Sequence, residues 1–290
     1  MNKKEYYLSV ASVAFLAIIA GYVWFNPVET KILKPNAEIL PSSIELPIIW
    51  GNLGARMISA GVIDRDKLEA IYAQRGGLTD EEKQLLEGET GKLKITQKNS
   101  GFILNMLWAL GLGNKNEILE KGPMITYSGA DSPAEALAKA GNFASTGGWT
   151  LAKGDAMAHY SKHSFITITQ TQQLLVEEVS KNIYRPCCDN PTHFPDCNHG
   201  MAMLGLLELM ASQAVSESDM YKIALVVNSY WFPDTYLTIA KYLKEKKNTS
   251  WVDADPKEIL GRNYSSGSGY KNILNQVAPP INNKGQGCGI

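Results

Sequence analysis

The stretch MAMLGLLELM, residues 201–210, is apolar on almost every face that a helix would present, and Glu208 is its single charged residue. A helix of this kind is buried on all sides in a folded protein. It is too short to cross a membrane, which takes about 20 apolar residues. The stretch therefore predicts a helix, extending to Ser212, that runs through the middle of a folded core.

Helical signals recur on both sides of this stretch. Apolar residues follow helical spacing, and several of the segments begin with a capping residue, such as Thr79 with Glu82 three positions later. The segments expected to be helical are 64–74, 79–87, 102–110, 132–140, 169–184, 216–233 and 236–246. Strand signals are scarce, and only residues 164–169 form a short β-branched run. The predicted fold class is mainly α, a helical bundle domain on an N-terminal transmembrane helix with long connecting loops.

The N-terminus has the composition of a membrane span. Residues 6–25 contain no charged side chain, and a helix of that length crosses about 30 Å of hydrocarbon. Lys3 and Lys4 precede the span, which favours a cytoplasmic N-terminus and an extracytoplasmic soluble domain. A cleaved signal peptide is the alternative, but Trp24 and Phe25 are unlike the small residues of a cleavage site. The expected localisation is single-pass membrane, with the lipid bilayer as partner of residues 6–25.

Composition divides the chain into four parts. We expect an anchor over 1–26, a proline-containing stalk over 27–48, a helical domain over 49–277 and a flexible tail over 278–290 that carries Cys288. An apolar content of 44% supplies a core. A formal net charge of −1, with no basic stripe, argues against binding to nucleic acid. Nothing in the sequence identifies a protein partner.

The loop before the apolar helix is rich in metal-ligand side chains. Residues 187–199, CCDNPTHFPDCNH, contain three of the four cysteines and two of the four histidines. Thiolates and imidazoles bind transition metals firmly, and prolines stiffen the loop. Asn198 is the expected N-cap of the following helix. The predicted ligands, which also include the cysteine of the tail, are Cys187, Cys188, Cys197, His199, His193 and Cys288.

The spacing of these residues leaves the metal open. Cys187 and Cys188 are adjacent rather than separated by the two to four residues usual in zinc sites, and adjacent side chains point apart in extended chain. That arrangement suits a multinuclear cluster, although it matches no ferredoxin spacing. An extracytoplasmic location with Met201 and Met203 nearby suits copper. Zinc and an iron–sulfur cluster are equally favoured, and copper is placed behind them.

Disulfides are the main alternative to a metal. An even number of cysteines outside the cytoplasm often means bridges, here for example Cys188 to Cys197 and Cys187 to Cys288. The protein would then be a disulfide-stapled helical interaction domain without metal. Disulfides give no reason for the two histidines in the same loop, and this favours the metal interpretation.

A cysteine-dependent enzyme is the third hypothesis. A cysteine beside His193 or His199, with Asp196 or Asn198 to orient the imidazole, has the residue types of a Cys-His-Asn arrangement. Such partners are normally far apart in sequence, whereas these crowd into one loop. The chain also has no phosphate-binding glycine loop, nucleophile elbow or zinc-protease helix, so an enzyme is disfavoured.

Three further features have weaker functional interpretations. His159 and His163 are four residues apart, so on a helix both imidazoles would lie on one face within reach of one ion. Exposed or hydrogen-bonded histidines are the more common case. Glu208 is expected at an exposed edge or paired with a basic residue, and Met201 and Met203 are expected to fill the core.

Overall fold

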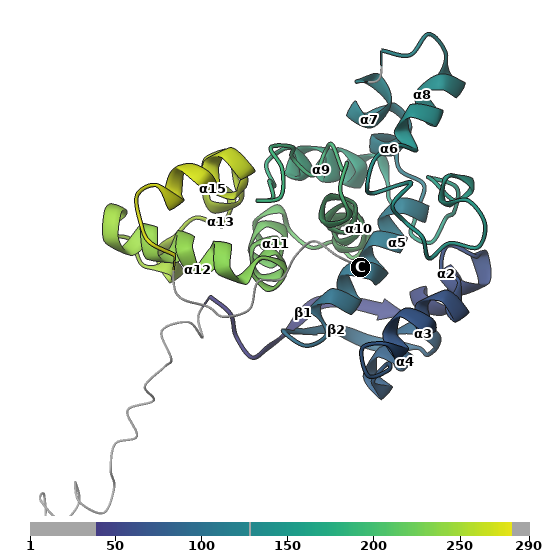
Figure 1. Cartoon of the computed structure of the whole chain (residues 1–290), viewed down its shortest axis with the longest axis horizontal. Helices are drawn as coiled ribbons and strands as arrows, with labels where there is room; N and C mark the ends of the chain where they lie inside the picture. Colours follow the sequence, from purple (N-terminus) through teal and green to yellow (C-terminus); the bar gives the residue numbers. More distant parts are fainter. Residues whose placement is uncertain (1–38, 128, 280–290) are drawn as a thin grey trace, which may run out of the picture. The chain divides into compact units, whose positions relative to one another are not determined.

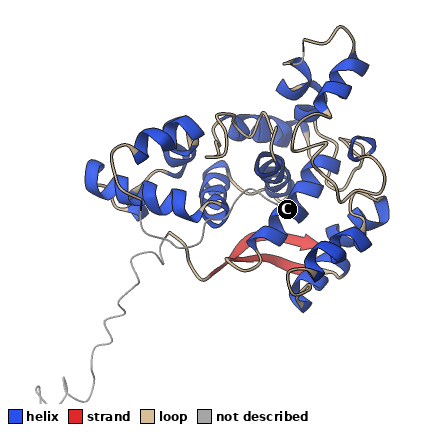
Figure 2. Cartoon of the chain, viewed as in Figure 1, coloured by secondary structure: helices blue, strands red, loops and turns tan. Residues whose placement is uncertain are grey.

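The computed structural model of the protein describes residues 39–127 and 129–279 (Figure 1). This part of the chain is mainly helical, as predicted (Figure 2). Within these two ranges no helix combines the length and the apolar character that a membrane crossing requires. The predicted span over 6–25, the first part of the predicted stalk and Cys288 lie outside the described residues.

The elements follow one another closely along the chain. The first half contains β1 (Ser43–Gly51), α2 (Leu53–Ala60), α3 (Arg65–Ala73), α4 (Asp80–Glu87), β2 (Thr90–Thr96), α5 (Ser100–Gly113), α6 (Glu117–Lys121), α7 (Pro123–Thr126) and α8 (Pro133–Ala140). The second half contains η1 (Ala156–Ala158), α9 (Gln170–Lys181), α10 (Asn198–Ser212), α11 (Glu217–Trp231), α12 (Pro233–Tyr242), η2 (Leu243–Lys247), η3 (Trp251–Asp253), α13 (Pro256–Leu260), α14 (Arg262–Ser265) and α15 (Gly267–Leu274).

Local capping chemistry sets several helix starts. Thr79 and Glu82 form the expected capping box at α4, in which the Thr79 backbone N–H donates to the Glu82 carboxylate at 2.8 Å. The Thr169 side chain caps α9 in the same way, and Ser132 and Ser216 cap α8 and α11. These predictions are confirmed, because a side-chain oxygen at the N-cap satisfies a backbone N–H that has no partner within the helix.

Helix α10 is the centre of the fold. All its residues except the two at its ends are buried, so the predicted core helix is confirmed. It packs on α5 in the most extensive contact between two helices of the described chain. Gly111 and Gly205 make this close approach possible, because a Cβ on Gly111 would lie 2.1 Å from the Met201 carbonyl oxygen. A Cβ on Gly205 would lie 2.5 Å from the Leu107 carbonyl oxygen.

Two strands that we did not expect pair beside these helices. Strands β1 and β2 are antiparallel, from Ser43 opposite Thr96 to Gly51 opposite Thr90, with an irregularity between Glu45 and Ile49. In β1 the side chains alternate between exposed and buried, and the buried ones are Leu46, Ile48 and Trp50. That period of two is a strand signal. The prolines nearby led us to assign residues up to 48 to a stalk, whereas residues 43–48 belong to the folded domain.

One other local expectation is wrong. Residues 164–169 form no strand, because Ser164 and Phe165 offer their backbone carbonyl oxygens to the Arg56 guanidinium instead of to a neighbouring strand. The serine and glycine residues over 265–269 have the composition of a turn. They include the start of α15, where the Ser266 hydroxyl accepts from the Gly269 backbone N–H at 3.0 Å.

Candidate metal centre

The cysteine loop connects α9 to α10 and folds back on itself. Tyr184 and Pro191 form an isolated antiparallel bridge, and the Thr192 backbone N–H donates to the Ile183 carbonyl at 2.8 Å. The start of α15 holds the outer side of the loop, since the Gly267 backbone N–H donates to the Cys188 carbonyl at 2.8 Å. These bonds bring the two ends of the loop close together.

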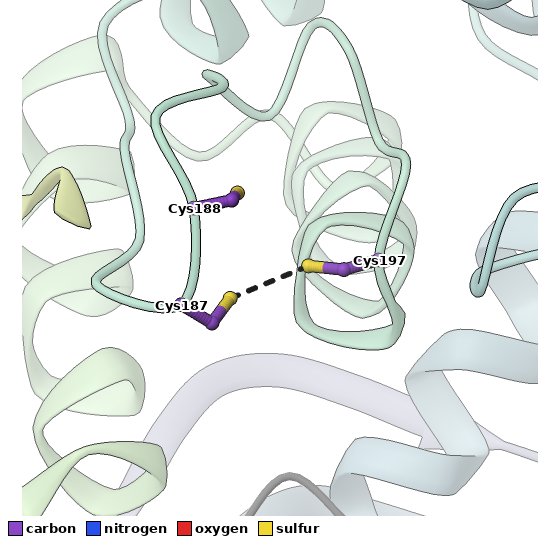
Figure 3. A group of neighbouring side chains, drawn as sticks. All are labelled: Cys187, Cys188 and Cys197. Atoms are coloured by element: carbon purple, nitrogen blue, oxygen red, sulfur yellow. Dashed lines mark hydrogen bonds between the residues drawn. The ribbon is translucent and has the colours of Figure 1, made fainter.

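The three described cysteines converge at this point. One sulfur from each of Cys187, Cys188 and Cys197 lies within 4.8 Å of the other two. The Cys187 and Cys197 sulfurs are 3.5 Å apart, and the thiols are free. Figure 3 shows Cys187 and Cys188 on one side of the loop and Cys197 facing them from the other. The expectation that the adjacent cysteines point apart is therefore wrong, because the backbone is not extended there.

The buried side chain of Arg185 holds the loop together through hydrogen bonds. The side chain of Arg185 is only 2% exposed. Its Nε donates to the Cys197 sulfur at 2.9 Å, and its Nη1 and Nη2 donate to the carbonyl oxygens of Asn190 and Phe194 at 3.0 and 2.9 Å. Nη2 also forms an ion pair with Asp196. One guanidinium thus joins four points of the loop, which a planar group with five N–H donors can do.

Asp196 and Gly200 complete the support of Arg185. The second carboxylate oxygen of Asp196 accepts from the Asn190 side-chain amide at 2.8 Å, so both oxygens have donors. Gly200, in the first turn of α10, leaves space for the guanidinium, because a Cβ there would lie 2.6 Å from the Arg185 Cζ. Sequence reasoning missed Arg185. Its position directly before Pro186 and the cysteines was the available signal.

The three thiols differ in acidity. Hydrogen bonds from Cys187 and Cys188, together with the Arg185 charge, hold the pKa of Cys197 well below its ordinary value of 9.0. Hydrogen bonds with Cys188 and Cys197, together with burial, raise the pKa of Cys187. Cys197 is also the N-cap of α10, where the helix dipole favours a negative charge. Cys197 is thus the most acidic thiol of the three. Because Cys197 occupies the N-cap of α10, the prediction that Asn198 caps this helix is wrong.

The predicted histidine ligands lie outside the three-sulfur group. His199 is 6% exposed and packs its ring on Trp231 and Phe232, with ring centroids 5.8 and 4.3 Å away. It lies beside Cys197, and its hydrogen bond lowers the pKa of that thiol. His193 is half-buried, and its backbone N–H donates to the Ser180 carbonyl at 3.0 Å. Among the described residues the structure therefore brings together three of the predicted ligands.

The buried carboxyl of Glu208 is a second feature that sequence reasoning placed wrongly. Glu208 is fully buried and accepts from the side-chain amides of Asn114 and Asn116, both at 2.7 Å. Asn116 in turn accepts from the Gln173 amide at 3.1 Å. The expected exposed position or basic partner is therefore wrong. Asparagine donors on the loop after α5 take the place of a cation.

The residue types of a Cys-His-Asn arrangement are present, but the side chains of Asp196 and Asn198 have other hydrogen-bond partners than an imidazole. The Asp196 carboxylate is occupied by Arg185 and Asn190. The Asn198 side-chain oxygen accepts from the His199 backbone N–H at 2.9 Å rather than from an imidazole. Comparison of the chain with protein-family models, curated proteins and solved structures finds no match. The arguments about function therefore rest on the geometry of the site.

Proposed function

We propose that the protein binds a transition metal ion through Cys187, Cys188 and Cys197. The observation that carries the proposal is the convergence of three sulfurs within 4.8 Å. A four-coordinate ion with sulfur ligands at about 2.3 Å holds them about 3.8 Å apart. The present spacing needs only a small adjustment of side-chain torsions to reach that value.

We propose zinc as the bound ion. The convergence of both adjacent cysteines on one point supports a single tetrahedral ion over a multinuclear cluster. Three thiolates around a divalent ion carry a net charge of −1, and the buried Arg185 guanidinium offsets it. An iron–sulfur cluster and, behind it, Cu(I) are the other soft-ligand choices. His199 and Cys288 are candidates for a fourth ligand.

The charged surroundings favour a structural or sensing site over a catalytic one. Arg185, Asp196 and Asn190 satisfy one another inside the loop. They therefore serve to hold the cysteines in place. A metal bound there would lock the connection between α9 and α10 at the edge of the core, so its binding free energy would stabilise the fold.

Metal content and thiol count test the proposal directly. The full chain is purified without oxygen, and bound metals are measured by elemental analysis beside free thiols. We expect about one zinc per chain in the parent protein, little in Cys187→Ser or Cys197→Ser, and parental content in His193→Ala, the matched control from the same loop. A metal-free parent protein with all its thiols free would overturn the proposal.

A disulfide is the second candidate, favoured by the 3.5 Å separation of the Cys187 and Cys197 sulfurs. Closing this gap to the bonded distance of about 2.05 Å gives a bridge across the loop. The thiol count separates the two candidates. A bridged protein lacks two thiols until a reductant is added and retains no metal, whereas the metal protein has a full set of thiols after chelation.

We also propose that residues 6–25 anchor the protein in a membrane with the helical domain on the extracytoplasmic side. The support is the uncharged run and the preceding Lys3 and Lys4. A reporter that is active only outside the cytoplasm, fused after Ile290, tests the orientation, and resistance to alkaline extraction tests the anchoring. An inactive reporter on a stably expressed chain would reverse the orientation.

A further inference from the structure

The imidazoles of His159 and His163 form a second cluster of metal-ligand atoms, apart from the cysteine loop. The His159 Nδ1 and His163 Nε2 atoms are 3.1 Å apart. The segment that carries them is not a helix, on which the spacing of four would have placed both imidazoles on one face. Only Ala156–Ala158 form a single 3-10 turn here. Their approach is therefore a product of the loop conformation.

The loop is held in that conformation by strained but well-anchored backbone. Ser161 has a φ of 53°, in the left-handed region that residues other than glycine seldom adopt. Its hydroxyl accepts from the Asn116 backbone N–H at 3.0 Å, and its own backbone N–H donates to the Leu112 carbonyl at 2.9 Å. The His163 backbone N–H donates to the Gly113 carbonyl at 2.8 Å. These bonds turn the chain so that His163 faces His159.

A carbonyl oxygen fixes the tautomer of one imidazole. His159 Nε2 lies 3.1 Å from the Lys153 carbonyl oxygen, and a carbonyl can only accept, so Nε2 carries the proton. His159 Nδ1 therefore presents its lone pair toward His163. Histidines that bind metals usually donate their other ring N–H to such an acceptor, which orients the ring and increases its basicity.

We propose that His159 and His163 form a two-histidine site for a divalent transition metal ion. Two nitrogens that each lie about 2.0 to 2.1 Å from one ion are about 2.8 to 3.4 Å apart for angles between 90 and 109°. The observed 3.1 Å falls within this range. Imidazole ligands favour zinc, nickel, copper or cobalt over magnesium or calcium.

The surroundings leave room for the remaining ligands. Both imidazoles are partly exposed, so water can complete the coordination, and the side chains of Lys153 and Lys162 are exposed and can extend away from the ion. The ring of Phe165 packs beside His163, with centroids 5.1 Å apart, and limits its rotation. On binding, the His163 proton moves from Nε2 to Nδ1 through solvent, so the ion replaces the hydrogen bond between the rings without a net change in protonation.

Cobalt(II) and zinc(II) are the probes for the test, used with the full chain. Cobalt bound by cysteine thiolates shows intense charge-transfer absorption, whereas cobalt bound by imidazoles does not. With the cysteine site first filled with zinc, we expect the parent protein to bind one further cobalt ion, and this ion should not add to the charge-transfer absorption. His159→Gln and His163→Gln should each weaken that binding at least about tenfold, and His193→Gln, the matched control, should leave it unchanged.

A measurement on the parent protein covers the case in which a variant fails to fold. Zinc(II) should shift the imidazole NMR resonances of His159 and His163. If these resonances respond to pH but not to zinc, the pair shares only a proton and the proposal is wrong. Equal cobalt affinity in the parent and both glutamine variants would also overturn it. The charge-transfer band reports the cysteine site separately, so failure at one site is distinguishable from failure at the other.

Discussion

Glu208 makes a strong prediction about the pH dependence of stability. Burial raises its pKa from the ordinary 4.5 to about 8, although the hydrogen bonds from Asn114 and Asn116 lower it in part. Between these two values the folded protein retains a proton on Glu208 that the unfolded chain releases. The contribution of Glu208 to the free energy of unfolding should therefore be most favourable below pH 4.5 and should fall as the pH rises from 4.5 to 8.

The size of the effect follows from the two pKa values. Each tenfold change in proton affinity corresponds to about 1.4 kcal/mol. Relative to low pH, the titration of Glu208 therefore lowers the free energy of unfolding by about 3 kcal/mol at pH 7, where the folded protein still holds the proton, and by about 5 kcal/mol at pH 9. Glu208→Gln keeps the shape and removes the titration. The free energy of unfolding of this variant should therefore lack the component that falls with pH in the parent protein.

Urea unfolding of the parent and Glu208→Gln at several values between pH 5 and pH 9 measures this difference. The exposed Glu89 provides the control variant Glu89→Gln, which should follow the parent curve. We expect the parent to lose about 4 kcal/mol relative to Glu208→Gln across the range. Parallel curves, within about 1 kcal/mol, would show that the two asparagine donors solvate the carboxylate as well as water does, and would refute the reasoning.

Three further predictions concern the loop and the helix caps. Arg185→Met should lower the free energy of unfolding by about 3–5 kcal/mol and reduce metal content, because it leaves buried acceptors and a carboxylate without their donor; denaturant midpoints and elemental analysis check this. Gly200→Ala should cost about 1–3 kcal/mol, since the new Cβ would overlap the guanidinium. The control is Gly101→Ala, where a Cβ meets nothing within 4 Å and no comparable loss is expected. Thr79→Ala should cost about 1 kcal/mol and increase amide hydrogen exchange in the first turn of α4, because the capping box with Glu82 is lost. A fully retained midpoint in any of the three variants would contradict the contact on which it rests.

The longer helices could be predicted from the sequence, whereas α2, α6, α7 and α13 to α15 were not. Capping residues such as Thr79, Ser132 and Thr169 act on backbone groups within three positions, so the information they carry is local. The apolar stretch at 201–210 identified α10 as the core helix for a similar reason. A helix with no polar face has only one stable environment.

Strand positions could not be predicted in the same way. Strand β1 carries the alternation Leu46, Ile48 and Trp50, but its partner β2 lies about 40 residues later in the chain. A strand is stabilised by hydrogen bonds to a distant segment, and nothing within β1 specifies that segment. A proline at position 47 further disguised it, although an outward-facing residue of an edge strand can be a proline.

The candidate site could likewise be predicted only in part. The cysteine loop was visible from composition alone, because soft ligands concentrated in thirteen residues are a chemical signal that needs no fold. Which side chains meet was decided by the tertiary structure. Arg185 pulls Cys197 and Asp196 toward one buried guanidinium, and this brings the three sulfurs together while leaving His193 outside the group. Glu208 was expected at an exposed edge or beside a basic residue, because the sequence does not show that the packing of α5 on α10 supplies the asparagine donors that make its burial possible. The burial of Glu208 and the convergence of the three sulfurs depend on contacts between separate segments of the chain. The local sequence does not specify these contacts.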